Sequence, residues 1–537
     1  MSADASIQLV PYGDDPLRYL AWLLHERHQD RLPDLSRQIV LFPHTGAIPR
    51  FRRILLKQAG HAGHAALLPP YIGMLSAWAR RYASENQQPL SETAREILLR
   101  DLLGEIPAWS HQYDAWPLVD SLLTLFDELT LQRCQLPDQP DRFLLQIAQN
   151  IVAEMDEASP FIDEAGLVHA LWTAWRARLA KNHWQDAPLQ ITDGLQRSLD
   201  GLPRDSHLYL AGFVDFTRAE LDWIKTLQAQ GRLTLVLQGR ATAKPADPAA
   251  NFWRGLDATP VAGAAPDAYA LFLDRAFALN DGSLSQRAQK QQSASRASPA
   301  RGRLTIHEAA DAESEARAID LQVRRWLLQG CRDIGIVTSD RKLARRVRAL
   351  LERANVGLLD TGGWTLSTTS AATALARWLE CLEQNFAHGP LLDLLKSPFL
   401  QLGWGRAELD RLVPWFEQHV VRERNIAAGL DNYRSGLNRV RADLATQAGP
   451  EVVDALEQLL ERIQTAAAAL IELRHSRPRA ALDFLEALQE SLVNLGLAAG
   501  FENDDAGSEL LAVLEEMRVA AIHSGLRLSW TEFHQWL

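Results

Sequence analysis

Cysteine and long apolar runs are both scarce in this sequence of 537 residues. Its three cysteines, Cys134, Cys331 and Cys381, are far apart and form no Cys-x-x-Cys pair, which excludes a disulfide framework and a structural zinc site. Apolar stretches such as residues 118–131 are interrupted by charge and are shorter than the roughly 20 residues that a bilayer span needs. The N-terminus lacks the basic and apolar regions of a signal peptide. We therefore expect a cytoplasmic protein that contacts no membrane.

A phosphate-binding loop is also missing. Walker-type loops need glycines, a lysine for the β- and γ-phosphates and a hydroxyl for magnesium, and no Gly-Lys-Ser/Thr occurs in the chain. No Gly-x-Ser-x-Gly motif occurs either. The sequence therefore predicts neither ATP hydrolysis nor independent nucleophilic catalysis. The net charge of -11 argues against a wholly basic nucleic-acid coat, although a local basic channel is compatible with it.

The segment 208–221 combines a buried-strand pattern with an acidic turn and a helix. It reads Leu-Tyr-Leu-Ala-Gly-Phe-Val-Asp-Phe-Thr-Arg-Ala-Glu-Leu. Such a strand brings Asp215 to the carboxyl edge of a sheet, where nucleotide-binding sheets keep their metal-binding acid. The alternative is structural, because Asp215 together with Thr217 could cap the following helix.

A β-α-β pattern opens the chain, with apolar runs at 7–11 and 38–43 around a helical pattern at 17–24. The second run is followed by His44, Thr45 and Gly46 and then by a basic helix. This position suits an anion at a helix N-terminus. The basic residues of that helix are Arg50, Arg52, Arg53 and Lys57.

Residues 71–189 are helical in pattern, and strand patterns resume at 208–213 and 233–237, which indicates an interrupted α/β domain. Residues 281–303 are mostly Ser, Ala, Gln and Arg, which is typical of a flexible linker, with a DNA-contacting linker as the alternative. A second α/β unit follows. Its strands are expected at 304–307 and 333–337, its helices at 313–328 and 342–353, and only helices after 369.

Several segments of this second unit resemble the start of the second motor domain in superfamily 1 helicases of the UvrD and RecB type. They are Glu313-Ser-Glu-Ala-Arg-Ala-Ile-Asp, Asp333-Ile-Gly-Ile-Val-Thr-Ser-Asp-Arg, Leu350-Leu-Glu-Arg-Ala-Asn-Val and Asp360-Thr-Gly-Gly-Trp-Thr-Leu-Ser-Thr-Thr. Phe42-Pro-His-Thr-Gly stands in place of a phosphate loop, and Ala211-Gly-Phe-Val-Asp-Phe-Thr in place of the DExx motif. In this order the segments resemble the AddB family, which is related to RecC.

The resemblance implies an α/β fold of degenerate superfamily 1 helicase-like (P-loop NTPase-like) RecA-like domains with large all-helical insertions. The first RecA-like domain would comprise 1–75 and 191–280, with 76–190 as a helical insertion. The flexible linker 281–303 would lead to the start of a second RecA-like domain at 304–375, and a helical domain would occupy 376–537. Family members continue into the rest of the second motor domain and a nuclease, so we expect this chain to be a truncated form.

The function implied is a DNA-binding, ATPase-inactive subunit of an AddAB/RecBCD-type double-strand-break repair exonuclease, associated with the nucleoid. Its partners would be DNA ends, single-stranded or forked DNA, and an AddA-like helicase-nuclease subunit. No cofactor is expected in this chain, because ATP and Mg would belong to the partner motor, and Mg with an iron-sulfur cluster to the missing nuclease domain. His44, Thr45, Gly46 and Asp215 would be the remnant of a nucleotide site.

Basic residues supply the candidate DNA contacts, and a solvated basic face is the alternative. The candidates are Arg341, Lys342, Arg345, Arg346 and Arg348, together with Arg50 and Arg53. Trp364 and Trp404 could stack on bases, although core packing is the more ordinary role.

Two other functions remain open from the residues alone. Asp340 and Lys342 match half of a PD-(D/E)xK nuclease motif, whereas Ser339 or Asp340 could simply cap the basic helix. A metal-dependent nuclease and a scaffold that binds only protein are therefore the competing hypotheses. The histidine pairs His25/His28 and His61/His64 lack a third metal ligand, and we expect ordinary surface residues there.

Overall fold

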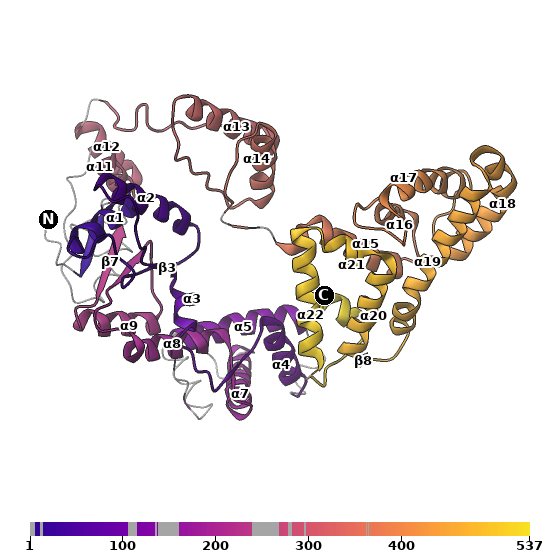
Figure 1. The fold of residues 1–537 in the computed structure, drawn as a ribbon, viewed down its shortest axis with the longest axis horizontal. Helices are drawn as coiled ribbons and strands as arrows, with labels where there is room; N and C mark the ends of the chain where they lie inside the picture. The colour runs from indigo at the N-terminus through magenta and orange to yellow at the C-terminus, as the bar shows by residue number, and fades with distance from the viewer. Residues whose placement is uncertain are drawn as a thin grey trace. The chain divides into compact units, whose positions relative to one another are not determined.

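The fold is described from a computed structural model (Figure 1). The chain forms two compact units, Met1–Ala83 with Ile191–Gly363, and Ser84–Gln190 with Trp364–Leu537. The described residues are 6–10, 14–105, 115–134, 137, 160–238, 268–277, 282–294, 297–360, 362–363, 365–522 and 524–537. No helix among them is long and apolar enough to cross a bilayer.

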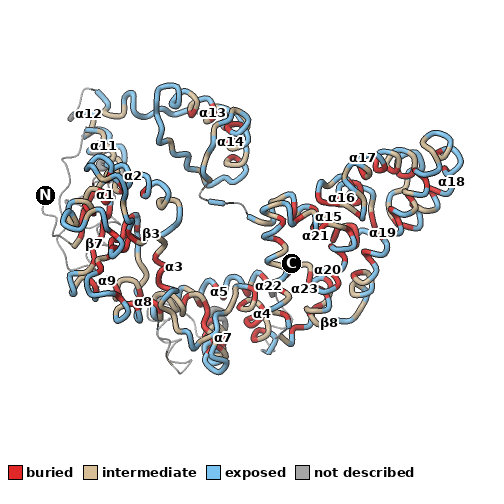
Figure 2. The backbone as a smooth tube through the Cα atoms, in the orientation of Figure 1, coloured by how far each residue is buried: buried red, intermediate tan, exposed pale blue. Residues whose placement is uncertain are grey.

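A five-stranded parallel sheet forms the centre of the first unit, which confirms the α/β prediction. Its strands, in spatial order, are β1 (Ile7–Val10), β7 (Leu233–Gln238), β6 (Leu208–Ala211), β2 (Ile39–Phe42) and β3 (Tyr71–Met74). Nearly all of their residues are buried (Figure 2). This explains why the strands are mostly apolar, because a parallel strand covered on both faces has no regular polar alternation; buried exceptions include Gln8 in β1 and Thr234 in β7.

Helices cover both faces of the sheet. On one face, α1 (Pro16–Arg27) and α2 (Ala47–His61) pack on Val40, Tyr209 and Val236. On the other, α3 (Leu75–Arg80), α8 (Ala187–Gly201) and α9 (Arg218–Ala229) pack on Leu41 and Leu210. The domain is thus doubly wound, and its sheet is completed only after the long helical segment that separates β3 from β6.

Polar side chains occupy the α1 face near the amino ends of the strands. Arg27 Nη1 donates to Thr234 Oγ1 at 2.5 Å, and His207 Nε2 lies 2.8 Å from the same oxygen. His28 Nε2 is 2.9 Å from the buried Tyr209 hydroxyl. The prediction that His28 is an ordinary surface residue is therefore wrong, since a helical i, i+3 pattern does not show which histidine turns toward a sheet.

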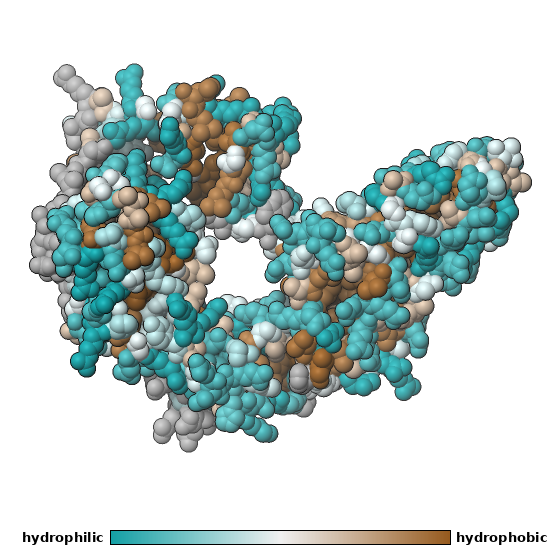
Figure 3. All heavy atoms as spheres, in the orientation of Figure 1, coloured by the Kyte–Doolittle hydropathy of each residue, from teal (hydrophilic) through white to brown (hydrophobic). Residues whose placement is uncertain are grey.

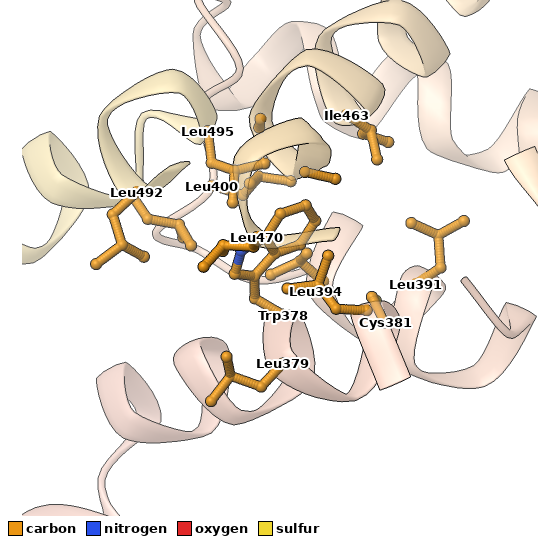
Figure 4. Packing of buried hydrophobic residues seen from close by; sticks show 14 of the residues in the cluster. Trp378, Leu379, Cys381, Leu391, Leu394, Leu400, Ile463, Leu470, Leu492 and Leu495 are labelled. Carbon is orange, nitrogen blue, oxygen red and sulfur yellow. The ribbon is translucent and has the colours of Figure 1, made fainter. Parts of the chain in front are cut away.

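The second unit combines an inserted helical segment with a C-terminal one. The inserted segment contains α4 (Glu92–Gly104), α5 (Ala115–Leu131) and α7 (Pro160–Lys181). In its core the ring centroids of Phe126 and Trp172 are 5.0 Å apart. Trp378 is fully buried at the centre of the C-terminal helices and donates to Ser491 Oγ at 2.9 Å (Figure 4). Those helices are α15 (Ser370–Glu383), α16 (His388–Leu395), α17 (Arg406–Trp415), α18 (Leu430–Ala448), α19 (Pro450–Arg474), α20 (Ala481–Leu495), α21 (Leu497–Phe501), α22 (Asp505–Ile522) and α23 (Trp530–Trp536).

The predicted second α/β unit has its helices but not its sheet. Helices α13 (Ala312–Leu328) and α14 (Arg341–Arg353) pack together around Val323 and Val347. The strands expected at 304–307 and 333–337 do not form, and Ile306 and Val337 are 87% and 99% exposed. The reason is physical: a strand needs a hydrogen-bonded neighbour, and none pairs with these segments among the described residues. Hydrophobic residues gather on the surface around α13 (Figure 3).

The expected linker 281–303 also contains regular structure. Helix α12 (Leu284–Ala294) follows α11 (Ala268–Phe277) in the chain, and Arg287 Nη1 on α12 donates to Ala276 O on α11 at 2.9 Å. Alanine, glutamine and arginine favour helices, so a composition that is typical of linkers is also compatible with this one.

His207 provides a test of the polar network. Burial first, and then the neighbouring Arg27 and His28, lower the pKa of His207 to about 3. The folded chain therefore keeps this imidazole neutral while the unfolded chain protonates it at a pKa of about 6.5, so stability should fall as pH drops from about 6.5 toward 3, by at most about 1.4 kcal/mol per pH unit. Exchange of the Leu210 and Leu235 amides, corrected for intrinsic rates, measures the effect.

The variant His207→Gln should weaken this pH dependence, whereas His61→Gln, which changes an exposed histidine on α2, should leave it intact. Equal pH dependence in the His207 variant and the unmodified chain would contradict the prediction.

Candidate functional site

The carboxyl edge of the sheet brings the predicted nucleotide-site residues to neighbouring strands. Strand β2, followed by His44, Thr45 and Gly46, pairs directly with β6, which leads to Asp215. The chain leaves β2 through α2 on one face and β6 through α9 on the other, so this is a switch point of the sheet, where α/β folds bind their ligands.

A glycine with a positive φ begins the turn after β6. Gly212 follows β6 with a φ of 80°, and a Cβ added there would lie 3.7 Å from Pro43 Cδ. Such a positive φ is strained for other residues. The backbone conformation of this turn therefore favours Gly212, whereas the space beside Pro43 would accept a Cβ.

The two helices that begin at this edge differ in how their N-termini are satisfied. Helix α1 is capped by its own carboxylate, since Asp15 Oδ1 accepts from Leu17 N at 3.0 Å. Helix α2 begins after Gly46 without any side-chain cap. Arg50, in its first turn, is held by Asp15 Oδ2 at 2.8 Å. An anion at this edge would meet a carboxylate at α1. At α2 no side chain caps the first turn, but Ile48 N donates to Thr45 O at 3.0 Å and Pro49 has no N-H, so few backbone donors remain there.

Asp215 is not the cap of the helix that follows it. Thr217 Oγ1 accepts from Glu220 N at 3.3 Å, and Glu220 Oε2 accepts from Thr217 N at 2.8 Å, which is a complete capping box. Asp215 is exposed and makes no hydrogen bond or ion pair with the described residues. The capping interpretation holds for Thr217 and is wrong for Asp215.

The edge has some, but not all, of the groups that nucleotide phosphates require. Backbone amides, the guanidinium of Arg50 and the carboxylate of Asp215 are present. The turns 43–46 and 212–217 contain no lysine to contact the outer phosphates. This chemistry fits a weak anion site better than a site for ATP hydrolysis.

Most of the basic face on α14 is already engaged. Arg346 binds Glu313 through two contacts of 2.5 and 2.7 Å, and hydrogen bonds from Arg346 lower the pKa of Glu313 to about 2. Arg341 pairs with Asp360 at 3.1 Å, and Arg348 with Glu352 at 2.6 Å. These three predicted DNA contacts therefore carry little net positive charge.

The remaining candidates are distributed over both basic helices. Arg345 Nε donates to Arg341 O at 3.3 Å, so its side chain lies along the helix. The Lys342 and Arg53 side chains are exposed and form no ion pair within the described parts of the chain. Of the seven arginines and lysines that the sequence singles out, these two are the most available to a phosphate.

Asp340 is the N-cap of α14. Its Oδ1 accepts from Lys342 N at 2.7 Å and from Leu343 N at 3.3 Å, which confirms the capping interpretation. No group of three metal-ligating side chains lies together among the described residues. The nuclease hypothesis thus has only half a motif at this position, with its carboxylate committed to a helix end.

The aromatic candidates have different outcomes. Trp364 lies outside the described residues. Trp404 has one face covered by Arg462, whose guanidinium is 4.2 Å from the ring centroid. This packing role agrees with the structural alternative.

Part of this pairing could have been found in the sequence. Glu352 lies four residues after Arg348, a spacing that favours an ion pair on one helix face. Glu313 and Asp360 gave no comparable signal, because they reach Arg346 and Arg341 only through the packing of α13 and the segment after α14.

Comparison with models of known protein families finds no match for this chain. No sufficiently similar sequence is found among curated proteins.

The cap at Asp340 makes a separable prediction. The variant Asp340→Ala should destabilise the first turn of α14 by about 1 kcal/mol, because two backbone amides lose their acceptor. Faster hydrogen exchange of the α14 amides measures the loss. Ser339→Ala is the control and should leave exchange unchanged. A larger effect from Ser339→Ala than from Asp340→Ala would show that Asp340 is not the N-cap.

Proposed function

We propose that this chain is a DNA-binding, ATPase-inactive, helicase-like subunit of an AddAB/RecBCD-type DNA repair complex. The observation that carries the proposal is the switch point of the parallel sheet. There the turns of His44 and Asp215 meet as in a nucleotide site, but without a lysine for the phosphates. The order of the helicase-like segments supports the same assignment.

The long insertion between β3 and β6 is consistent with this proposal. The sheet's core is continuous although residues 84–190 separate its third and fourth strands in sequence. An α/β motor domain that carries a helical insertion would have this organisation. On this proposal the five-stranded sheet is the core of the first, degenerate RecA-like domain. ATP and Mg would be bound by an AddA-like partner.

Helix α2 is the leading candidate for a DNA backbone contact. It contains four arginines and lysines and no acidic residue, and its N-terminus has no side-chain cap. Arg52, Arg53 and Lys57 are exposed, and the described residues supply no ion-pair partner for them. Exposed cations of this kind are what contact DNA phosphates.

A scaffold that binds only protein is the second candidate. It is favoured by exposed apolar residues around α13 and the segments beside it, including Ile306, Leu328 and Val337. Apolar surface of this kind is typical of protein interfaces. The two candidates differ in whether the chain alone binds nucleic acid.

DNA binding by the full chain tests the proposal. Fluorescence anisotropy with labelled single-stranded and forked DNA should show affinity that falls steeply between about 50 and 200 mM salt, because phosphate contacts release counterions. Replacing Arg52, Arg53 and Lys57 with alanine should weaken binding and reduce the logarithmic salt slope by about one per lost contact.

A charge-conserving control separates local contact from net charge. The double variant Glu408→Ala/Arg411→Ala removes one acid and one base from an existing ion pair on α17 and should bind DNA nearly as the unmodified chain does. Absence of DNA binding even at low salt would overturn the proposal and favour the scaffold.

A further inference from the structure

The last helix of the chain, α23, joins the two sequence-distant parts of the second unit. Trp116, at the start of α5 in the insertion, stacks on Trp536 with ring centroids 5.6 Å apart and planes inclined by 12°. The Trp116 indole N-H also donates to Glu532 O at 3.0 Å. Both rings are more than nine-tenths buried, so this contact excludes water from the junction.

A second contact uses the carboxylate that begins α23. Glu532 Oε2 accepts from Ser529 N at 2.9 Å as part of a capping box, and its Oε1 accepts from Arg100 on α4 at 3.0 Å. One side chain therefore orders the helix and binds it to the insertion. The α4 helix also packs against α22, and Ile97 shares the core of the C-terminal helices.

Glu96 lies one helical turn before Arg100 and is surrounded by acids. Burial chiefly, and then Asp120 on α5 and Glu92 on α4, raise the pKa of Glu96 to about 7, with a smaller contribution from Glu516 on α22. The Trp536 indole favours the charged carboxyl but does not reach hydrogen-bond geometry with it.

The nearby cations are committed to other acids. Arg100 binds Glu532, and Arg518 on α22 binds Glu515 at 2.7 Å. His534 on α23 lies 2.7 Å from Glu383 on α15. Of the acids around Glu96, Glu92 is paired with Arg95 at 2.8 Å, whereas Asp120 and Glu516 form no ion pair with the described residues. A charge on Glu96 therefore adds repulsion against Asp120 and Glu516 at the junction.

We propose that α23 is a clasp that holds the insertion, residues 84–190, against the C-terminal helices, and that protonation of Glu96 strengthens the clasp. The inference is independent of DNA binding and of any nucleotide site. On this inference, the contacts of α23 hold the insertion and the C-terminal helices together.

The sign follows from the direction of the shift. A carboxyl group whose pKa is raised in the closed junction binds its proton more tightly there than in an opened one, where its pKa returns toward 4.5. Closing is therefore most favourable at low pH. It weakens as pH rises from about 4.5 through about 7, and stays at its weaker value above that.

Hydrogen exchange of the full chain tests the clasp. The Phe533 and Leu537 amides, which donate within α23, report its opening. At about pH 8, Glu96→Gln should slow their exchange roughly tenfold relative to the unmodified chain, and at about pH 5 the two should match, since a neutral amide mimics the protonated acid. Glu128→Gln, an exposed change on α5, is the matched control and should have no effect at either pH.

A second variant tests the clasp apart from its pH dependence. Arg100→Met keeps the aliphatic stem but removes the ion pair to Glu532, and it should speed exchange of the α23 amides together with those of α4. Unchanged exchange in this variant would overturn the clasp itself. Identical exchange of Glu96→Gln and the unmodified chain at both pH values would overturn the role of Glu96.

Discussion

Backbone pairing of β6 with β2 on one side and β7 on the other is the constraint on which the rest of the first unit depends. It joins segments that are more than 160 residues apart and places the turns of His44 and Asp215 at one switch point. The insertion can be long because its ends return to this sheet. The same pairing turns Tyr209 and Thr234 toward α1, where they bind Arg27 and His28 and give the amino end of the sheet its polar, pH-sensitive character.

The two sets of predicted strands show how far a local pattern carries. All four runs at 39–42, 208–211, 304–307 and 333–337 were predicted as strands, yet only the first two become strands. Those two are continuously apolar, whereas the others are interrupted by Thr305, His307 and Gly335. A continuous apolar run indicates that a segment could be buried between layers, but the hydrogen bonds of a strand come from a neighbour that the run itself does not specify. Helices α13 and α14 were predicted and are present in the structure, because the backbone hydrogen bonds of a helix form within the segment itself.

For the candidate-site residues, too, contacts within a short segment could be predicted from the sequence and contacts between distant segments could not. The cap at Asp340 and the ion pair of Arg348 with Glu352 arise within a few residues, so spacing was enough to suggest them. The pairing of Arg346 with Glu313 and the exposure of Asp215 depend on tertiary packing and on a competing local cap, Thr217. The density of basic residues along α14 therefore overstated its positive potential, since two of the acidic partners, Glu313 and Asp360, lie on other segments.

An acidic protein can bind a polyanion only where basic side chains are not paired with acids. The chain carries 67 acidic against 56 basic side chains, so long-range attraction to DNA is unfavourable and binding must depend on short-range, locally positive surface. Helix α2 meets this requirement better than α14 because it has no acid of its own, and only Arg50 is paired, to the cap of α1. The N-terminus of α2, which no side chain caps, adds its partial positive charge to that of these cations. On the proposed function, a DNA backbone that follows α2 would meet these uncompensated cations, whereas most cations of α14 are already paired.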